Sequence, residues 1–386
     1  MGKMLNPLRV GMVIAINLAL DIAIISGIGL CGFGMIACLR SSADYWQNKN
    51  KINDMKLKLI NLLACPKCKQ ELSCEAHKKD ENDGILEGVL NCAKCGEDFP
   101  ITNGIPRFVP LDNYGSSFGY QWNLFRKEQI DSHNGTDLSA KRFWSETGWT
   151  KEFLKGKWIL DAGCGAGRFL DVSSTSEAEV VGIDISNAID AAKENLQGRE
   201  NVHFVQASIY ELPFKEEIFD ACYCIGVIQH TPDPAKTMAC LPKILKEKGQ
   251  LAVTIYEKRK WFTRLHSKYL LRPITNRLPQ PFLLKLIKGG MPIFFPLTNV
   301  LFRLPILGKY FMFAIPIANY VNEPRLSEEQ RKAWAILDTF DMLAPAYDQP
   351  QTELEARTAL LETGLSEIQR LSNPGLNLIG EKHSAN

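Results

Sequence analysis

Residues 161–167 combine one acidic residue, Asp161, with three alternating glycines, Gly163, Gly165 and Gly167, directly after a short apolar run. Such a run is typical of a buried parallel strand, and the glycines let the backbone turn sharply and approach a ligand. Asp184 ends a second apolar run, at a place where a carboxylate accepts both hydroxyls of a ribose. The pattern predicts a ligand site where two strands end, although a glycine-rich turn alone is shared with dinucleotide-binding domains.

A histidine follows the fourth predicted strand, Phe219–Ile225, in the sequence Ile-Gly-Val-Ile-Gln-His-Thr-Pro-Asp-Pro. His230 is therefore expected at the carboxyl end of a sheet, where open α/β folds bind their ligands. Imidazole is suited to act as a general base on a hydroxyl or a phenol. A structural role, in which His230 caps the loop or touches a bound ligand, is the alternative.

Four cysteines form two Cys-x-x-Cys pairs, Cys65 with Cys68 and Cys92 with Cys95. Two such pairs can place four thiolates around one tetrahedral zinc ion, and the metal then supplies much of the folding free energy of a small domain. The alternative, a redox-active Cys-x-x-Cys motif, does not explain why the sequence contains two such pairs. Other cysteines fall in predicted core elements, which favours a reducing compartment.

The segment from about Lys155 to Glu257 resembles the class I S-adenosylmethionine-dependent methyltransferases, and residues 55–110 resemble the small zinc-ribbon activator subunits of methyltransferases. The resemblance implies an α/β fold, with a Rossmann-like seven-stranded sheet, helices on both faces and a small N-terminal zinc ribbon. S-adenosylmethionine and a structural Zn²⁺ are the implied cofactors. An NAD-binding Rossmann domain is the alternative, but the glycine series and the step Leu212-Pro213-Phe214 fit the methyltransferase pattern better. The expected strands are 158–160, 180–184, 202–206, 219–225, 249–256, 367–371 and 376–380, with a helix over 351–363.

The resemblance also implies which residues bind the cofactor. The glycine turn and the helix after it would hold the aminocarboxypropyl end, Asp161 would pair with its amino group, and Asp184 would take the ribose. Ser208 stands where many relatives carry an Asp for the adenine amino group, with the backbone of Ile209 beside it. The predicted set is Asp161, Gly163, Gly165, Gly167, Asp184, Ile185, Ser208, Ile209 and Ile225, with His230 as the catalytic residue.

The first apolar stretch, Val10–Leu39, is long enough as a helix to exceed a bilayer core of about 30 Å. More Lys and Arg residues follow it than precede it, so the body of the protein is expected on the cytosolic side. If translation begins at Met55, the anchor is lost and the protein is cytoplasmic. The expected segments are an anchor (1–54), a zinc ribbon (55–110), the cofactor half (111–257), a basic aromatic insert or lid (258–322) and the C-terminal part (323–386).

The insert 258–322 contains no Asp or Glu but eleven Lys or Arg residues, interleaved with aromatic and aliphatic ones. Its prolines are expected to cut it into short amphipathic helices that suit an anionic membrane surface. A basic lid with an ordinary core is the alternative; nucleic acid is not expected, and the net charge of +2 gives no bias toward it.

The predicted function is methyl transfer to a small or amphipathic acceptor, such as a lipid-linked sugar, a quinone precursor or another isoprenoid. The rival from another class is a zinc-ribbon scaffold that binds the cofactor and regulates a partner without turnover. The aromatic segment Ser116–Phe125 has two interpretations. It is a helix at the sheet edge, or it covers the cofactor with Tyr120, Gln121 and Trp122 beside the sulfonium.

Overall fold

The computed structural model describes residues 57–81, 83–110, 113–258 and 262–383. All of them belong to one compact unit, Asn53–Asn386. The expected anchor over residues 1–54 lies outside the described residues.

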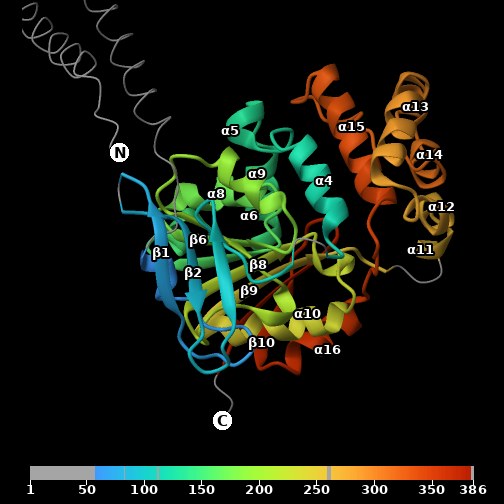
Figure 1. The fold of residues 1–386 in the computed structure, drawn as a ribbon. Coiled ribbons are helices and arrows are strands. Elements are labelled where there is room, and N and C mark those ends of the chain that lie inside the picture. Colours follow the sequence, from blue (N-terminus) through green and yellow to red (C-terminus); the bar gives the residue numbers. More distant parts are fainter. Residues whose placement is uncertain (1–56, 82, 111–112, 259–261, 384–386) are drawn as a thin grey trace, which may run out of the picture. The chain divides into compact units, whose positions relative to one another are not determined.

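A seven-stranded sheet forms the centre of this unit (Figure 1). Its strands are β5 (Trp158–Ala162), β6 (Glu179–Asp184), β7 (Val202–Gln206), β8 (Phe219–Ile225), β9 (Leu245–Ile255), β10 (Leu365–Arg370) and β11 (Leu376–Lys382). They lie in the order β10-β11-β9-β8-β5-β6-β7. All neighbours pair in parallel except β11, which runs antiparallel to both β9 and β10. The predicted fold class is confirmed, with the C-terminal hairpin at the expected place.

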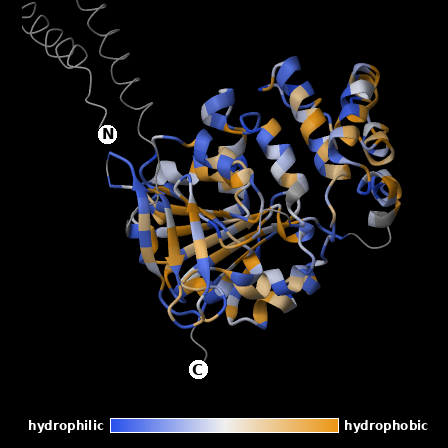
Figure 2. Cartoon of the chain, viewed as in Figure 1, coloured by the Kyte–Doolittle hydropathy of each residue, from blue (hydrophilic) through white to orange (hydrophobic). Residues whose placement is uncertain are grey.

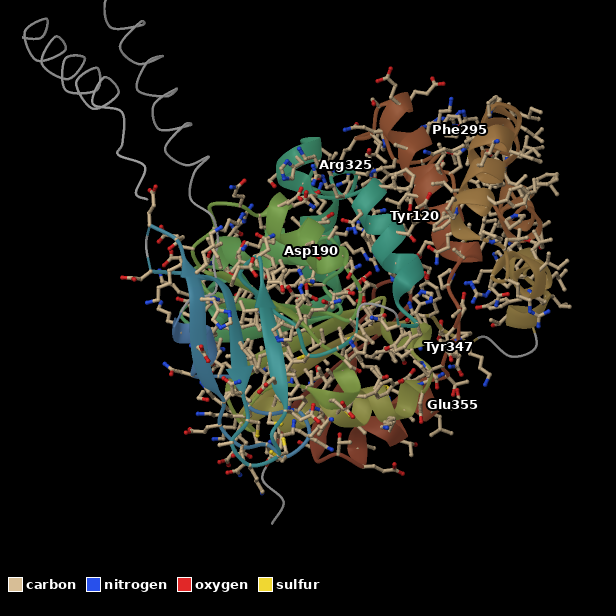
Figure 3. All side chains as sticks on the ribbon, viewed as in Figure 1. Tyr120, Asp190, Phe295, Arg325, Tyr347 and Glu355 are labelled. Carbon is tan, nitrogen blue, oxygen red and sulfur yellow. The ribbon has the colours of Figure 1, made fainter. Side chains whose placement is uncertain are left out.

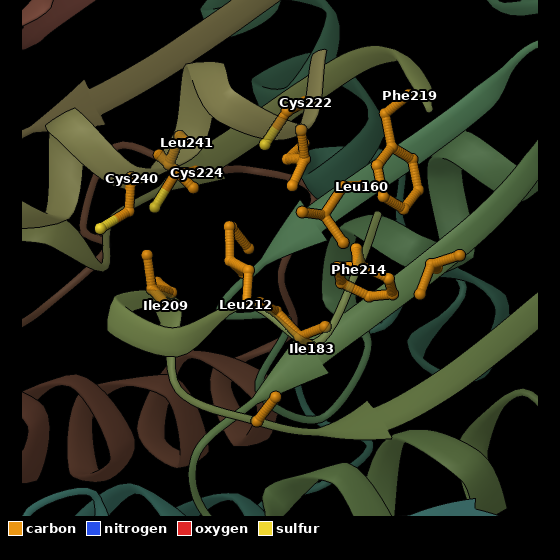
Figure 4. Packing of buried hydrophobic residues seen from close by; sticks show 14 of the residues in the cluster. Leu160, Ile183, Ile209, Leu212, Phe214, Phe219, Cys222, Cys224, Cys240 and Leu241 are labelled. Atoms are coloured by element: carbon orange, nitrogen blue, oxygen red, sulfur yellow. The ribbon is translucent and has the colours of Figure 1, made fainter. Parts of the chain in front are cut away.

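Helices cover both faces of the sheet, because each parallel crossover carries the chain over one face. Successive strand residues enter opposite cores, so that Leu160 packs on one face and Ile159 on the other. The helices α6 (Leu138–Thr147), α8 (Arg168–Ser173) and α9 (Ala188–Asn195) cover the second face. The helices α10 (Pro234–Cys240) and α16 (Glu353–Leu361) cover the first, around the cluster shown in Figure 4. Shorter helices are α3 (Leu57–Ile60), α5 (Asp131–Asn134) and α7 (Lys151–Leu154), and the 3₁₀ turns are Ser174–Ser176, Ile209–Glu211, Ile228–His230 and Leu241–Ile244.

A small antiparallel sheet precedes the large one. Its strands follow in sequence order: β1 (Ser73–Lys79), β2 (Ile85–Asn91), β3 (Asp98–Thr102) and β4 (Ile105–Pro106). The small sheet lies against β7, the edge strand of the large one: the Phe108 N–H donates to the Gln206 carbonyl at 2.8 Å, and Arg107 pairs with Asp190 at 2.7 Å. The Ala64 N–H also donates to the Pro213 carbonyl at 3.0 Å. The small sheet thereby covers an edge that would otherwise expose unpaired backbone groups.

The insert forms a helical layer beside the sheet, seen at the right of Figure 1. Its helices are α11 (Phe262–Leu265), α12 (Ser267–Thr275), α13 (Gln280–Leu301) and α14 (Gly308–Ala314), and α13 packs against α15 (Glu328–Leu343). The buried side of α13 contributes Leu284, Met291 and Phe295 to a core shared with α15.

The expectation that prolines cut the insert into short helices is wrong for α13. This helix runs for 22 residues through Pro292 and Pro296. Both prolines lie on its exposed side, so their rings do not disturb the packing against α15. Tertiary packing on the buried side therefore outweighs the loss of two backbone hydrogen bonds. Within the described residues, no helix has both the length and the apolar character needed to cross a bilayer.

Candidate active site

A cavity of about 560 Å³ opens at the carboxyl ends of β5, β6 and β8. Its floor is the glycine turn after β5, and its far wall is the helix α15, which follows the insert. The helix α4 (Ser116–Leu124), packed between α9 and α15, lies beside it. The cavity thus joins the predicted cofactor residues to a segment more than a hundred residues later in the chain.

The glycine turn needs its glycines for two reasons. Gly163 has φ +91° and Gly165 has φ +53°, which are left-handed conformations that favour glycine. A Cβ on Gly163 would lie 2.6 Å from a methyl group of Val227, and one on Gly165 would lie 3.2 Å from the Trp122 ring nitrogen. Both residues line the cavity, so no side-chain atoms separate the backbone from a ligand there.

Gly167 has a different place in the structure. It is the N-cap of α8 with φ +89°, and a Cβ there would meet Leu196 at 3.0 Å and Ala192 at 3.3 Å. Gly167 is not part of the cavity lining. Its lack of a side chain serves the close approach of α8 to α9.

Asp184 lies at the end of β6 with its carboxylate in the cavity lining. One oxygen accepts from the Gly165 N–H at 2.9 Å, and the other accepts from the Ser186 N–H at 2.8 Å and from its hydroxyl at 2.6 Å. Burial raises the pKa of Asp184, and these hydrogen bonds oppose the shift. The carboxylate is therefore held in one orientation before a ligand binds.

Three further predicted residues, Ile185, Ile209 and Ile225, line the same cavity. Asp161 and Ser208 do not. Asp161 is buried, and burial raises its pKa strongly, although the nearby Tyr223 hydroxyl opposes the shift. The Ser208 hydroxyl accepts from the Tyr210 N–H at 3.2 Å and caps a 3₁₀ turn. Contacts of Asp161, Gly167 and Ser208 with a cofactor stay predictions, beside the local roles that the structure gives these residues.

His230 lines the cavity from the loop after β8, and its side chain is buried. Its Nδ1 lies 2.9 Å from the Tyr347 carbonyl oxygen. Its ring packs against Phe118 and Tyr256, with centroids 5.2 and 5.5 Å apart. Because a carbonyl can only accept, Nδ1 carries the proton, and in the neutral ring the lone pair is on Nε2.

Two carboxylates on α15 were not predicted from the sequence. Asp338 and Asp341, one helical turn apart, both line the cavity. Gln129 donates to Asp338 at 3.1 Å, and the Tyr320 hydroxyl bonds to its other oxygen. Burial raises the pKa of Asp338 to about 7 and also raises that of Asp341, where His230 opposes the shift. The spacing Asp-x-x-Asp, which places both side chains on one face of a helix, could have drawn attention to them. Only the fold, however, brings that face to the cavity.

Two arginines were also missed. Arg168 donates to Gln129 at 2.7 Å, and burial lowers its pKa to about 9. Because Gln129 also donates to Asp338, it bridges the cation on α8 and the acid on α15. Arg142, paired with Glu146 at 2.9 Å, lines the cavity next to Gly226. The hydrogen bonds through Gln129 thus connect the α15 wall to α8, the helix that follows the glycine turn.

The helix α4 contributes part of the predicted cover. Trp122 lies over Gly165 and lines the cavity, and Phe118 does so beside His230. Tyr120 points instead to Phe340 of α15, at a centroid distance of 6.2 Å, and is labelled in Figure 3. Gln121 is buried and does not line the cavity.

The four predicted cysteines come together at two turns beside the small sheet, one before β1 and one between β2 and β3. The sulfurs of Cys65 and Cys95 are 3.5 Å apart, those of Cys68 and Cys92 are 3.4 Å apart, and all four lie within 4.8 Å of one another. Such spacing fits four thiolates around one tetrahedral zinc ion with Zn–S bonds of about 2.3 Å. In the part of the chain that the structure describes, these four cysteines are the one group of His, Cys, Asp or Glu side chains close enough together to hold a metal ion.

Comparison with known families agrees with both parts of this geometry. Residues 160–253 match the family described as a methyltransferase domain, which spans the glycine turn, Asp184 and His230. The chain carries a class I methyltransferase domain. Residues 56–104 match the family described as Trm112p-like protein, so the methyltransferase domain is preceded by a Trm112-like region with the four cysteines.

Curated relatives match part of the chain. One is the ubiquinone biosynthesis O-methyltransferase of Alkalilimnicola ehrlichii, 30% identical over 159 residues, or 35% of this chain and 64% of the relative. Another is the protein of the same name from Aromatoleum aromaticum, 31% identical over 125 residues, or 31% of this chain and 53% of the relative. The chain thus spans about half to two thirds of the length of these relatives.

Solved structures give weaker likenesses. A complex of the Haloferax volcanii Trm112 methyltransferase activator with a second protein has 12% identity and a TM-score of 0.39, over 70% of this chain and 99% of that one. The magnesium protoporphyrin IX methyltransferase of Synechocystis has 15% identity and a TM-score of 0.38, over 70% and 96%. At these TM-scores the likenesses carry no weight in assigning a function.

The methyltransferase domain fits S-adenosylmethionine, because the bare glycine turn and the oriented Asp184 carboxylate line one cavity. We expect Gly163→Val and Asp184→Asn each to weaken S-adenosylmethionine binding by about 1–3 kcal/mol, measured by calorimetric titration. Gly135→Val, at φ +73° with open space around it, and Asp137→Asn at the surface are the matched controls. If both cavity variants bind S-adenosylmethionine as tightly as the wild type, and their circular dichroism spectra match that of the wild type, the proposed binding site is wrong.

The cysteine cluster predicts close to one zinc ion per chain. Cys92→Ser should lose most of this metal, because a three-sulfur site no longer closes the tetrahedron. Cys74→Ser, which changes a cysteine outside the cluster, should keep it. Elemental analysis of the purified proteins decides; full zinc content in Cys92→Ser would show a different ligand set.

Proposed function

We propose that this protein is an S-adenosylmethionine-dependent methyltransferase that methylates a hydroxyl of a small or amphipathic, quinone-like acceptor. One observation carries the proposal: the glycine turn, Asp184 and His230 line a single cavity. A cofactor held by the first two therefore has a proton acceptor within the same enclosed space.

The bound cofactor supplies an electrophilic methyl carbon next to a sulfonium. The chain's own residues have three tasks. Asp184 takes the ribose hydroxyls and fixes the cofactor, because its carboxylate is already oriented by Gly165 and Ser186. His230 removes the acceptor's hydroxyl proton with Nε2, the nitrogen left without a proton by the Tyr347 contact. The α15 wall bounds the cavity on the side opposite the glycine turn and limits the access of water there.

The acceptor is proposed from the wall of the cavity and from the relatives. Asp338 and Asp341 line it, and because burial raises their pKa values each carboxyl can accept a hydrogen bond or, when protonated, donate one, which suits hydroxyls on a ring better than a carboxylate. Trp334, Leu337 and Met342 supply apolar surface beside them. Relatives named ubiquinone biosynthesis O-methyltransferase support a hydroxylated quinone precursor as the acceptor class.

We also propose that the insert docks on the cytosolic surface of an anionic membrane, with residues 1–54 as an anchor. Many residues of its helices are apolar, as the orange segments of these helices in Figure 2 show, and a number of their side chains are exposed. The exposed set includes Leu270, Ile274, Phe282, Leu286, Ile293, Leu297, Val300, Leu307 and Tyr310. On α13 several follow helical spacing along one side, with the exposed cations Lys285 and Lys288 on the same helix. Because the insert contains no acid, its charge is complementary to anionic lipid.

The base role of His230 predicts a specific kinetic loss. With a prenylated catechol as the acceptor, His230→Ala should lower kcat by about 10²–10⁴ and leave S-adenosylmethionine affinity nearly unchanged. His77→Ala, on the exposed strand β1, is the control. A loss of cofactor affinity without a separate loss of turnover would support the structural role of His230. Cofactor binding without turnover on any hydroxylated acceptor would favour a regulatory scaffold.

The membrane proposal is tested on a chain that begins at Met55, since residues 53–386 form one compact unit. It should sediment with phosphatidylserine vesicles, less at high salt and much less with phosphatidylcholine alone. Each Lys or Arg near an anionic surface contributes about 1 kcal/mol, so replacing Lys285, Lys288, Arg303 and Lys309 with Gln should abolish most binding.

The matched control replaces four exposed lysines outside the insert with Gln: Lys78, Lys141, Lys151 and Lys155. This variant should bind vesicles like the parent chain. If the parent chain stays in the supernatant with anionic vesicles at low salt, the insert is a lid and a soluble acceptor becomes the better proposal.

A further inference from the structure

A short strap, Tyr347–Gln349, crosses the loop that carries His230 and is labelled at Tyr347 in Figure 3. The Tyr347 carbonyl accepts from His230 Nδ1 at 2.9 Å. Gln349 donates its N–H to the Gln229 carbonyl at 2.7 Å and its side-chain amide to the Thr231 carbonyl at 2.9 Å. The strap is therefore bonded to His230 and to the residue on each side of it.

The middle residue of the strap, Asp348, is held by the helix α12. Lys268 Nζ lies 2.8 Å from one carboxylate oxygen, and the Tyr269 hydroxyl lies 3.2 Å from the other. The Asp348 side chain is fully buried, and that of Lys268 is 11% exposed. Removing one member of such a pair leaves a buried charge without its partner, so the contact holds the strap firmly.

Lys268 reaches His230 by a second route. Its ammonium lies 4.6 Å from the centre of the Tyr256 ring, and that ring packs edge-on against His230. The same helix donates from Arg272 to the carbonyl oxygens of Met342 and Pro345, at 3.1 and 2.7 Å. The segment between α15 and α16 is thus fixed to α12 at several points around His230.

These contacts decide which nitrogen of His230 carries the proton. With the Tyr347 carbonyl in place, the neutral ring is protonated on Nδ1, and Nε2 keeps the lone pair. If the strap moves, nothing else in the described hydrogen bonds of His230 favours that tautomer. The neutral ring would then exist as a mixture of the Nδ1–H and Nε2–H tautomers.

We propose that Lys268 and Asp348 are positioning residues that hold His230 in its Nδ1–H tautomer through the strap. The inference rests on the proposed role of His230 as the base of the methyltransferase. It adds that the insert, through α12, is required for the chemistry as well as for packing against the α15 wall. The exposed apolar side of the same helix, with Leu270 and Ile274 each 65% exposed, belongs to the surface proposed to dock on the membrane.

The first test reads the tautomer directly and needs no acceptor. The full chain is labelled with ¹⁵N-histidine, and His230 is assigned by the signal lost in His230→Gln. Long-range ¹H–¹⁵N correlation should show one Nδ1–H tautomer in the wild type and a mixture of both tautomers in Lys268→Met and in Asp348→Asn. Lys285→Met, an exposed lysine of the neighbouring helix α13, should keep the wild-type pattern.

The second test separates positioning from folding. Lys268→Met should lower kcat on the prenylated catechol by about 10- to 100-fold, while S-adenosylmethionine affinity and the circular dichroism spectrum stay near wild type. An unchanged His230 tautomer in both variants would overturn the inference. If the tautomer becomes mixed but His230→Ala turns over normally, the positioning stands and the base role fails.

Discussion

The backbone of β6 holds the turn after β5 closed, and the candidate site depends on that constraint. The Ile183 carbonyl accepts from the N–H groups of Gly163 and Cys164 at 2.8 and 2.9 Å, and the Asp184 carboxylate accepts from Gly165. The turn can donate these hydrogen bonds only because its glycines adopt positive φ. The same carboxylate that closes the turn is thereby left facing the cavity, so the floor and its acidic group are positioned together.

The rest of the cavity is supplied by segments that the sheet does not contain. A buried polar network through Gln129 joins Arg168 on α8 to Asp338 on α15, and α13 packs against the outer side of α15. The wall opposite the glycine turn is therefore held by charge-assisted hydrogen bonds on one side and by apolar packing on the other. In this arrangement the ends of the sheet strands supply one side of the cavity, and α15, with the insert packed behind it, supplies the other.

The Trm112-like region is packed into the same unit as the methyltransferase domain. Its residues Leu63 and Leu90 share one apolar core with Leu160 and Val181 of the large sheet. Backbone hydrogen bonds from Ala64 and Phe108 tie it to the segment after β7 and to β7 itself. A region whose own core is small thus gains stability from its neighbour and, in return, covers that neighbour's edge strand.

Local sequence patterns determined much of this protein. The buried strands, the glycine turn with Asp184 and the cysteine pairs were all readable, because hydrophobic runs, positive φ and ligand spacing act over a few residues. The long helix α13 could not be predicted from the sequence, because its packing on α15 outweighs the prolines within it. The positions of Asp338 and Asp341 in the cavity wall could not be predicted either. The bond from His230 to Tyr347 spans 117 residues of sequence. Only the tertiary structure decides such contacts, because they depend on where distant segments pack and no local pattern encodes that distance.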